Sequence, residues 1–583
     1  QRQMCIRDSY NVSHLFGLFS MFPADAVESA ELMKGGFPAQ YGGRLSSVLK
    51  VTSHDGNRQG VTGSGGVSLI SSRMTLQGPV GNGSWMLSGR RTYLEPILAI
   101  AAKFNSGIDA FGYSFYDVQG KIQQNIFDRD RLEVSFYLGD DDLAYDQPTL
   151  NAGQLWGNRA ASVMWSHVAT DDIVTTYRLS GSRYRSRLRL QLEDVGAVET
   201  NRITDISGKT DITWFATDKH RIEVGADFVR HDMDYTFDFD QNRFNSFATK
   251  SWNWSAYAQD TWLPWPFLTI QPGMRASWFT NGDYATWNPR LSTRYQVGDN
   301  TFFKAAIGRY SQHLFRVSRE TQGLSIFSDL WFTADSTAGP SHAWQYIAGF
   351  ETRLGRDWDL DIEVYYKDFE RLAEFNNGIG PGEPTIGELL LRGEGEAYGL
   401  EVGVKKRAGE HTGWVSYSLG WATRTIAGIN TVESRDRDSE PQPYYPKFDQ
   451  RHSLNVVYQW QFTERWTFNS SYAFASGQPY TPLLGRYEMN DDLVTWEQTY
   501  TARTNSVRLP YYSRLDLGVR ANYRGWGITW QPFVQAINVL NRKNIFNRYW
   551  TDGDAEAVPP KPGTETNFPQ LPFLVTLGVD VMF

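Results

Sequence analysis

The chain has 583 residues, a formal net charge of −8 and 41% hydrophobic residues, and its mean hydropathy is negative. Aromatic residues make up 15% of it, which is too many large apolar rings for a disordered or low-complexity chain. The mild acidic surplus argues against a dedicated nucleic-acid-binding protein. Because no apolar stretch approaches the roughly 18 residues of a membrane helix, the pattern also excludes a helical membrane protein.

The first nine residues differ from the rest of the chain. They contain the single cysteine, Cys5, and lack the apolar core of a signal peptide. We interpret residues 1–9 as a non-native leader and expect the natural N-terminus to be missing. Since one cysteine can form neither an internal disulfide nor a cysteine metal cluster, we expect neither.

Residues 22–57 form the next distinct segment. Two short predicted strands flank a turn that is rich in glycine and proline. We therefore assign residues 10–58 to a small N-terminal unit and residues 59–583 to a second, much larger one.

From about residue 60 onward, apolar and polar residues alternate over segments of roughly ten to twenty residues. In the segment 453–462, the even positions are apolar from Leu454 to Phe462 and most odd positions are polar. In the segment 573–583, the odd positions are apolar from Phe573 to Phe583. Because successive side chains of a strand point to opposite faces, each such segment predicts a two-faced strand.

The connections between these strands alternate between short and long. Short polar turns occur at 81–83, 127–130, 217–220, 298–300, 355–358 and 463–466. Long connections are expected at about 94–112, 139–156, 236–250, 312–342, 375–393, 425–446, 476–509 and 551–568. This pattern predicts an up-and-down meander of about 22 strands, with one or two helical turns near residues 94–103.

A soluble β-propeller or sandwich is the alternative to a barrel. A propeller would repeat a blade motif about every 40 residues, and no such repeat is visible. A sandwich would need a second apolar layer, whereas nearly every predicted strand has one aromatic-rich apolar face and one polar face. A transmembrane antiparallel β-barrel, with lipid outside and water inside, explains both faces, so we predict an all-β fold of this kind.

Three short motifs in the N-terminal unit point to a known family. They are Val-Glu-Ser-Ala-Glu-Leu-Met-Lys-Gly-Gly at 27–36, Tyr-Gly-Gly-Arg-Leu-Ser-Ser-Val at 41–48 and Lys-Val-Thr at 50–52. Together they resemble the C-terminal part of the plug domain of TonB-dependent outer-membrane receptors. Phe37-Pro38 before the second motif resembles the branch common in Bacteroidota. With the meander that follows, the resemblance covers nearly the whole chain and implies a barrel with a partial plug in its lumen.

The resemblance implies active transport across the outer membrane. Such a receptor binds a scarce nutrient (siderophore-bound iron, cobalamin, an oligosaccharide or a peptide) with its extracellular loops and plug, and imports it with energy transmitted by TonB. The implied partners are the TonB complex, the barrel-assembly machinery, lipopolysaccharide and the nutrient, with a surface lipoprotein as a further candidate. We expect the coupling box that TonB contacts to belong to the missing N-terminal part. Two alternatives stay open: a passive or gated porin, and an adhesion barrel.

Candidate ligand-binding residues lie in the plug turn and in the long connections. In the turn they are Gln40, Tyr41 and Arg44. In the connections they are rings able to stack on a sugar or a siderophore: Trp331, Phe332, His342, Trp344, Trp496 and Tyr500. The same rings could instead form small apolar cores within the loops.

Three further residues concern the plug contact and barrel assembly. Arg44 is also a candidate for an ion pair between plug and barrel, with Glu363 or Asp516 as the lumen acid. The terminal Phe583 resembles the signal that barrel-assembly machinery reads on the last strand.

Four arginines alternate along one predicted strand and therefore share one face. They are Arg183, Arg185, Arg187 and Arg189. They come more than the ~10 residues that span a bilayer after the short turn near 170–172, so we place them above the outer leaflet. Facing outward, as the positions of Tyr177 and Leu179 indicate, they would pair with lipopolysaccharide phosphates. Facing inward, they would attract an anionic ligand. A solvated extension of the strand is the third interpretation.

No arrangement of residues predicts catalysis. The nine histidines are scattered without metal-ligand spacing, and no nucleophile stands beside a base. We therefore expect no enzyme, no catalytic residue, no metal and no cofactor. Asp140, Asp141 and Asp142 predict either a solvated loop or, less strongly, a calcium site.

Overall fold

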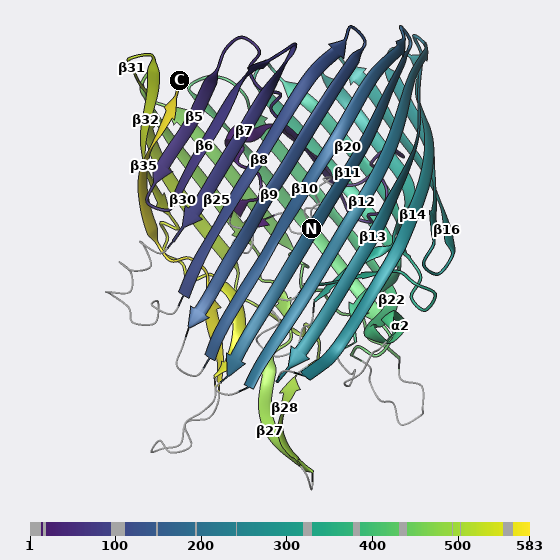
Figure 1. Ribbon diagram of the computed structural model, residues 1–583, viewed down its shortest axis with the longest axis vertical. Coiled ribbons are helices and arrows are strands. Elements are labelled where there is room, and N and C mark those ends of the chain that lie inside the picture. The colour runs from purple at the N-terminus through teal and green to yellow at the C-terminus, as the bar shows by residue number, and fades with distance from the viewer. Residues whose placement is uncertain are drawn as a thin grey trace.

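The described part of the chain forms one closed antiparallel β-barrel with a small N-terminal segment inside it (Figure 1). The computed structural model describes residues 13–14, 19–94, 111–146, 150–192, 195–240, 242–318, 329–376, 385–430, 440–491, 494–501, 503–551 and 564–583.

The first half of the wall contains the longest strands. In chain order it consists of β5 (Thr62–Ser68), β6 (Ser71–Val80), β7 (Gly83–Tyr93), β8 (Phe111–Phe127), β9 (Asp130–Asp146), β10 (Leu150–Thr170), β11 (Ile173–Leu192), β12 (Val195–Thr217), β13 (His220–Phe239), β14 (Asn242–Trp265), β15 (Leu268–Phe279), β16 (Tyr284–Gly298) and β17 (Thr301–Gln312).

The second half completes the circle. It consists of β20 (Ser341–Leu354), β21 (Trp358–Phe375), β22 (Leu390–Lys406), β23 (His411–Ile426), β24 (His452–Gln461), β25 (Trp466–Ala475), β30 (Tyr512–Ala521), β31 (Tyr523–Gly525), β32 (Ile528–Ile537) and β35 (Leu574–Met582). Only Asn522 separates β30 from β31, and both pair with β32, so they count as one strand. The described wall therefore has 22 strands, and the predicted barrel is confirmed.

The two faces of the wall differ as the alternation predicts. On β11, the exposed side chains of Tyr177 and Leu179 point outward, and the neighbouring Ser180 and Ser182 are buried on the inner side. Lipid accepts the apolar face and water accepts the polar face. Closure pairs the backbone groups of the edge strands, which hydrocarbon cannot solvate.

The barrel closes where the end of the chain meets its first strand. The last strand, β35, pairs with β5, and the backbone amides of Phe583 and Gly63 donate to each other's carbonyls at 3.0 and 2.9 Å. A Cβ atom on Gly63 would lie 2.4 Å from Cζ of the Phe583 ring. Glycine at this position therefore lets the terminal ring cover the seam.

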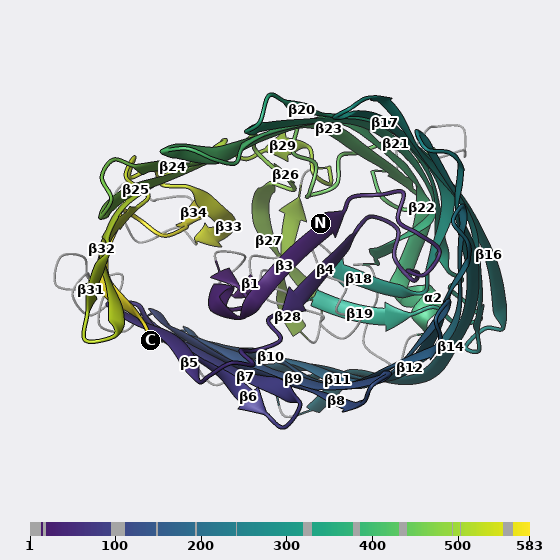
Figure 2. The ribbon, with the colours of Figure 1, turned by 90° about the horizontal axis from the view of Figure 1, so that it is seen from above.

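The wall is much taller on one side than on the other. Strands β12 and β14 have 23 and 24 residues, whereas β24, β25, β30 and β32 have 10 each. Separate small hairpins accompany the low side: β26 (Pro479–Tyr480) with β29 (Val507–Arg508), β27 (Leu483–Asp491) with β28 (Val494–Thr501), and β33 (Ile545–Thr551) with β34 (Thr564–Pro569). Another hairpin, β18 (Leu314–Ser318) with β19 (Asp329–Thr333), lies within the ring of strands (Figure 2).

The N-terminal segment crosses the lumen (Figure 2). It contains the pair β1 (Ser13–His14) and β2 (Phe19–Ser20), the short 3-10 helix η2 (Ala24–Ala26), and the hairpin of β3 (Val27–Met33) and β4 (Val48–Ser53). Residues 34–47 connect β3 to β4 and contain the turn that the sequence predicts. We call residues 13–57 the plug segment.

Two of the predicted long connections are mostly strand. Strand β9 continues to Asp146 and β10 begins at Leu150, so most of 139–156 is wall; likewise β13 reaches Phe239 and β14 begins at Asn242. In these segments the inner face carries buried side chains such as Leu143, Trp156 and Tyr235. The apolar-outside, polar-inside pattern of the membrane-spanning part therefore does not continue, although the pairing does. Most of the helical turn expected near 94–103 lies outside the described residues.

Helices are a minor part of the described structure. The α-helix α2 (Ile386–Leu389) is one turn long and begins with a capping box between Thr385 and Glu388. In the part of the chain that the structure describes, no helix has the length and apolar character needed to cross a membrane.

Candidate functional site: the contact between plug and wall

The plug turn at residues 37–41 is held by one arginine of the wall. Arg290 on β16 donates from its Nη1 atom to the carbonyl oxygens of Phe37 at 3.0 Å and of Tyr41 at 2.7 Å, and also to that of Pro38. Its guanidinium lies 4.4 Å from the ring centre of Tyr310, which packs against Phe37. Three carbonyls of the turn thus converge on one cation, which fixes the shape of the turn.

A second arginine braces the same turn from the neighbouring strand. Arg275 on β15 is 2% exposed and donates to both carboxylate oxygens of Asp227 on β13, at 2.9 and 2.7 Å. It also donates to the Ala39 carbonyl at 3.4 Å. A Cβ atom on Gly42 would lie 2.2 Å from Nε of Arg275, so the plug backbone reaches this guanidinium only because residue 42 is glycine.

Ion pairs tie other parts of the plug segment to the wall. Near its end, Asp55 pairs with Lys121 at 2.6 Å and with Arg131 at 2.8 Å. Near its start, Asp25 pairs with Arg73. Burial alone would raise the pKa of Asp55, but the hydrogen bonds and charges of its two cations outweigh burial and lower it.

The middle of the plug segment is tied to β21 and β22. Lys34 forms an ion pair with Glu401, and Lys367 donates to the carbonyls of Lys34 at 2.8 Å and Ser46 at 3.1 Å. Burial alone would lower the pKa of Lys34, but the hydrogen bond and the charge of Glu401, with Glu363 nearby, raise it. Lys34 is therefore held as a cation.

His14 makes the first described contact of the plug segment. Its ring nitrogens lie 2.8 Å from Asp117 and 2.7 Å from Asp141, and its ring stacks on Phe115 at 4.0 Å. Burial alone would lower the pKa of His14; the hydrogen bonds and charges of the two aspartates outweigh burial and raise it. A protonated histidine donates to both carboxylates, which suits this position.

These contacts are mostly polar. The apolar contact between the turn and the wall is one small cluster, formed mainly by Phe37, Leu45, Val48, Tyr310 and Ala343. Each polar contact can be exchanged for a contact with water at a modest net free-energy cost, whereas separating a large apolar core cannot. The turn is thus attached to the wall mainly by polar contacts.

The predicted plug residues lie at this contact. Gln40 and Tyr41 sit beside Lys209 of β12, whose Nζ atom lies 3.5 Å from the Gln40 carbonyl and 5.9 Å from the Tyr41 ring centre. Arg44 donates to the Gly43 carbonyl at 3.1 Å. Contact of these three residues with a ligand stays a prediction.

The two acids proposed for Arg44 have other neighbours. Glu363 lies close enough to Lys34 for its charge to raise the pKa of Lys34. Asp516 pairs with Arg514 of the same strand at 2.7 Å. Asp516 also accepts a hydrogen bond from the Asn538 amide at 2.9 Å. An ion pair of Arg44 with either acid stays a prediction.

The aromatic candidates are spread over different surroundings. Trp331 and Phe332 lie in β19 and are buried in two apolar clusters, which is the arrangement of a loop core. His342 and Trp344 lie in the wall strand β20 rather than in a loop. Trp344 shares the outward face of β20 with Tyr346, whose side chain is 45% exposed, while Gln345 between them donates inward to the Leu45 carbonyl.

Two further aromatic candidates, Trp496 and Tyr500, are in β28, on a hairpin that extends past the barrel rim (Figure 1). Their side chains lie outside the described part. Ligand contact of all the aromatic candidates stays a prediction.

The four arginines lie on the outer face of β11. Arg183, Arg185 and Arg189 are exposed and Arg187 is half-buried, whereas Tyr184 and Leu188 between them are buried inside the barrel. The geometry thus matches the outward orientation, and the choice between lipid phosphates and simple solvation stays open at this point.

The three aspartates at 140–142 belong to β9 and alternate between its faces. Asp140 accepts a hydrogen bond from the Tyr116 hydroxyl at 2.5 Å on the outside, and Asp141 holds His14 inside. Three carboxylates on alternating faces cannot surround one ion. Among the described residues, no cluster of potential metal ligands occurs.

Sequence reasoning missed the wall residues that hold the turn. Arg275, Arg290, Asp227 and His14 carry no local motif, and a single charge at an inward position looks like any other lumen residue. The only usable signal was Gly42, because a second glycine beside Gly43 indicates a close approach of the backbone.

Comparisons with known proteins agree with this architecture. The family model described as "TonB dependent receptor-like, beta-barrel" matches residues 77–541. No curated protein matches the chain significantly. A mutant ferric enterobactin receptor from Pseudomonas aeruginosa, solved with enterobactin, is 13% identical, with a TM-score of 0.65 over 97% of this chain and 87% of that chain.

Two further solved structures are similar in fold. The ferric citrate transporter FecA is 12% identical, with a TM-score of 0.68 over 97% of this chain and 85% of that chain. The siderophore receptor PiuA from Acinetobacter baumannii is 12% identical, with a TM-score of 0.68 over 97% of this chain and 87% of that chain. With a family model that matches most of its length and a barrel whose lumen holds a plug segment, the chain belongs to the TonB-dependent receptors, which are outer-membrane transporters and not enzymes.

Proposed function

We propose that this protein imports a scarce small nutrient through displacement of the plug segment by TonB. The nutrient classes are those that the resemblance implies: siderophore-bound iron, cobalamin, an oligosaccharide or a peptide. Ferric chelates are the first class to test, because the similar solved structures include receptors for ferric enterobactin and ferric citrate. The Phe37-Pro38 motif also makes the Bacteroidota-like branch part of the proposal.

One observation carries this proposal: Arg275 and Arg290 hold the plug turn by its carbonyl oxygens inside an otherwise wide barrel. A barrel of 22 strands without a plug would leave an open channel. A plug held by hydrogen bonds and ion pairs closes that channel and is separable without unfolding the wall. A porin would need no plug that closes the channel. An adhesin would need no plug that can separate from the wall.

The experiment locks the plug to the wall and measures uptake. A Cβ atom on Gly273 would lie 3.1 Å from Cβ of Ala39, a few tenths of an ångström less than the ~3.5–4.5 Å between the Cβ atoms of a disulfide, so a small shift of the turn would allow the bond. In a background with Cys5→Ser, the pair Ala39→Cys and Gly273→Cys is introduced. Cells that express the intact gene and lack other iron receptors are then given radioactive ferric enterobactin or ferric citrate, followed by cobalamin and oligosaccharides.

A matched control locks the wall to itself. Ser255 and Ser277 lie directly opposite each other on β14 and β15, with their Oγ atoms 3.0 Å apart. The pair Ser255→Cys and Ser277→Cys therefore forms a similar disulfide without tying the plug.

We expect uptake to stop when the 39–273 disulfide is oxidised, to return on reduction, and to continue with the 255–277 disulfide. Uptake should also vanish when the inner-membrane proton gradient is collapsed. Uptake that persists in either case would favour the porin and overturn the proposal. Binding of the ligand without any uptake would favour the adhesin.

A further inference from the structure

The outer face of β11 carries a row of cations that lack acidic partners. We call Arg183, Arg185, Arg187 and Arg189 the arginine row. Within the described part of the chain, none of the four forms an ion pair, and the buried Nε atom of Arg187 has no hydrogen-bond partner.

Other cations on the same wall are paired. Arg202 on β12 forms an ion pair with Asp234, and Arg159 on β10 lies 3.8 Å from Asp140. The arginine row thus differs from these neighbours in that none of its members forms an ion pair of its own within the described part of the chain.

The register brings these like charges together. Arg183 lies directly opposite Arg159, and Arg185 lies directly opposite Arg202. Like charges directly opposite each other on one face of a sheet destabilise it. Successive members of the row are two residues apart on a single strand, so they repel one another as well. A polyanion bound across the row would remove this repulsion.

The wall changes from apolar to charged just below the row. One register row joins Leu179, Gly208, Phe228 and Trp254 across β11 to β14. Another, four residues further along β11, joins Arg183, Thr204, Asp232 and Lys250. Four residues are about 13 Å of strand. The arginine row therefore begins where the apolar belt ends, at the level of lipid head groups.

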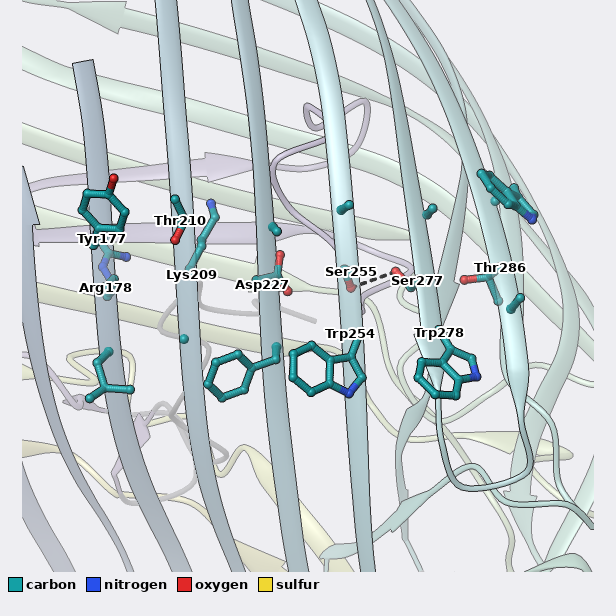
Figure 3. A pocket seen from close by; sticks show the side chains of 18 of the residues that line it. Tyr177, Arg178, Lys209, Thr210, Asp227, Trp254, Ser255, Ser277, Trp278 and Thr286 are labelled. Carbon is teal, nitrogen blue, oxygen red and sulfur yellow. Dashed lines mark hydrogen bonds between the residues drawn. The ribbon is translucent and has the colours of Figure 1, made fainter. Parts of the chain in front are cut away.

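An apolar depression lies in the belt beneath the row. It has a volume of about 790 Å³ and spans β10 to β16 on the outer face. The residues that line it include the small Ala226, Ala256 and Ala276. Rings also line it: Tyr177 on β11, Trp254 on β14 and Trp278 on β15 (Figure 3). Small residues between large rings leave space for a flexible apolar chain.

We propose that the arginine row and this depression together bind one phosphorylated glycolipid of the outer leaflet, of the lipid A type. The guanidinium groups hold its phosphates, for which the planar fork of arginine is well suited. Its acyl chains lie in the depression. The proposal uses the outer-membrane location of the family but not the identity of the imported nutrient, so it stands or falls independently of the proposed function.

The first test removes the charges of the row. Delipidated protein in detergent is mixed with bisphosphorylated, six-chain lipid A, separated from unbound lipid by gel filtration, and analysed by mass spectrometry. The variant combines Arg183→Gln, Arg185→Gln, Arg187→Gln and Arg189→Gln. We expect the wild type to retain the lipid and the variant to retain at least about tenfold less.

A control with the same change in charge alters the opposite rim. It combines Arg129→Gln, Lys219→Gln, Arg356→Gln and Arg465→Gln, which all lie in short turns. This control should retain lipid A like the wild type. Equal losses in both variants, or no loss in the first, would overturn the proposal. If the first variant does not fold, as judged by heat-modifiable gel migration, Arg185→Gln and Arg187→Gln are measured singly, and each should show part of the loss.

Two further arms separate the phosphates from the acyl chains. Dephosphorylated lipid A should be retained poorly by the wild type, and inorganic phosphate at millimolar concentration should not displace bound lipid A. Displacement by phosphate alone would identify a site for free phosphate and overturn the lipid proposal. Filling the depression with Ala226→Trp and Ala256→Trp should lower retention while the row is intact; full retention would show that the chains lie elsewhere.

Discussion

Cations on the inner face of the wall and the arginine row on its outer face differ in whether they have ion-pair partners. Inside, Arg275 is paired with Asp227, and Lys121 is paired with Asp55 of the plug segment. Outside, the arginines of the row form no ion pair among the described residues. The ion pair of Lys121 with Asp55 forms only when the plug segment is in place, so it stabilises the closed state. The four arginines of the row, unlike the paired Arg202 and Arg159 beside them, have no ion-pair partner within the described protein, and for them we propose a membrane lipid as the partner.

The largest effect should come from removing the buried ion pair between Arg275 and Asp227 on the inner face. Asp227→Ala leaves the Arg275 guanidinium buried without its carboxylate, and removing one partner of a buried ion pair costs about 3–5 kcal/mol. We expect the plug turn to become sensitive to proteases and the barrel to admit large antibiotics, while heat-modifiable migration shows an intact wall.

The control for Asp227→Ala is Glu351→Ala, which removes a partly exposed partner of Lys304 and Arg294. An exposed pair contributes about 1 kcal/mol or less, so this variant should stay closed. A closed, protease-resistant plug in Asp227→Ala would show that Arg275 does not hold the turn.

A smaller effect should come from overpacking the same contact. Gly42→Leu places a side chain where Nε of Arg275 lies, and overpacking of this kind costs about 1–3 kcal/mol. Antibiotic sensitivity should rise, though less than in Asp227→Ala. Gly60→Leu is the matched control, because a Cβ atom at residue 60 meets nothing within 4 Å. Equal sensitivity of both leucine variants would contradict the packing argument.

The contact of His14 should depend on pH. Its pKa is raised in the folded state, so its stabilising contribution is complete below the ordinary histidine pKa of about 6.5 and is lost as the pH rises through the raised value. In a background with Cys5→Ser, maleimide labelling of Ser13→Cys should be slow at low pH and faster above that range. The charged groups that face this ring include Asp117 and Asp141, with Arg90 bound to Asp117.

The matched variant for this pH effect carries His14→Gln together with Ser13→Cys. Maleimide itself reacts faster at high pH, and this variant shares that trend. Only the difference between the two labelling profiles therefore reports on the imidazole. Parallel profiles would remove His14 as the titrating group.

The smallest effect should come from a single substitution in the arginine row on the outer face. In lipid-free detergent, Arg185→Gln should leave the free energy of unfolding unchanged or raise it by about 0.2–1 kcal/mol, because the substitution removes the repulsion between residue 185 and the opposite Arg202. After addition of lipid A, the wild type should gain more stability than the variant. Identical responses of the two proteins to lipid A would argue against a bound phosphate at this level.

The sequence predicted the plug half of the candidate site but not the wall half. The plug turn around Gln40 and Tyr41 was visible because glycine and proline mark it in a continuous stretch of sequence. The wall residues that hold it, Arg275 and Arg290, come from separate strands and meet the turn only after the barrel has closed. Nothing in the sequence around either arginine distinguishes it from other polar lumen positions.

For the outer site, the sequence predicted which residues share a face but not which residues lie opposite them. Alternation at period two placed the four arginines on one face, because strand geometry alone requires it. The opposition of Arg185 and Arg202 depends on the register between β11 and β12, and the depression depends on five or more strands lying side by side. Neither is encoded within one segment.

The sequence by itself therefore determined the all-β class, the approximate number of strands, the two faces of the wall and the family, because these follow from local periodicity and from contiguous motifs. The tertiary structure alone decided how far each strand rises above the membrane, which wall charges hold the plug and which stay without a partner. The physical reason is that electrostatic and packing partners are chosen by register and closure, which join residues far apart in the chain.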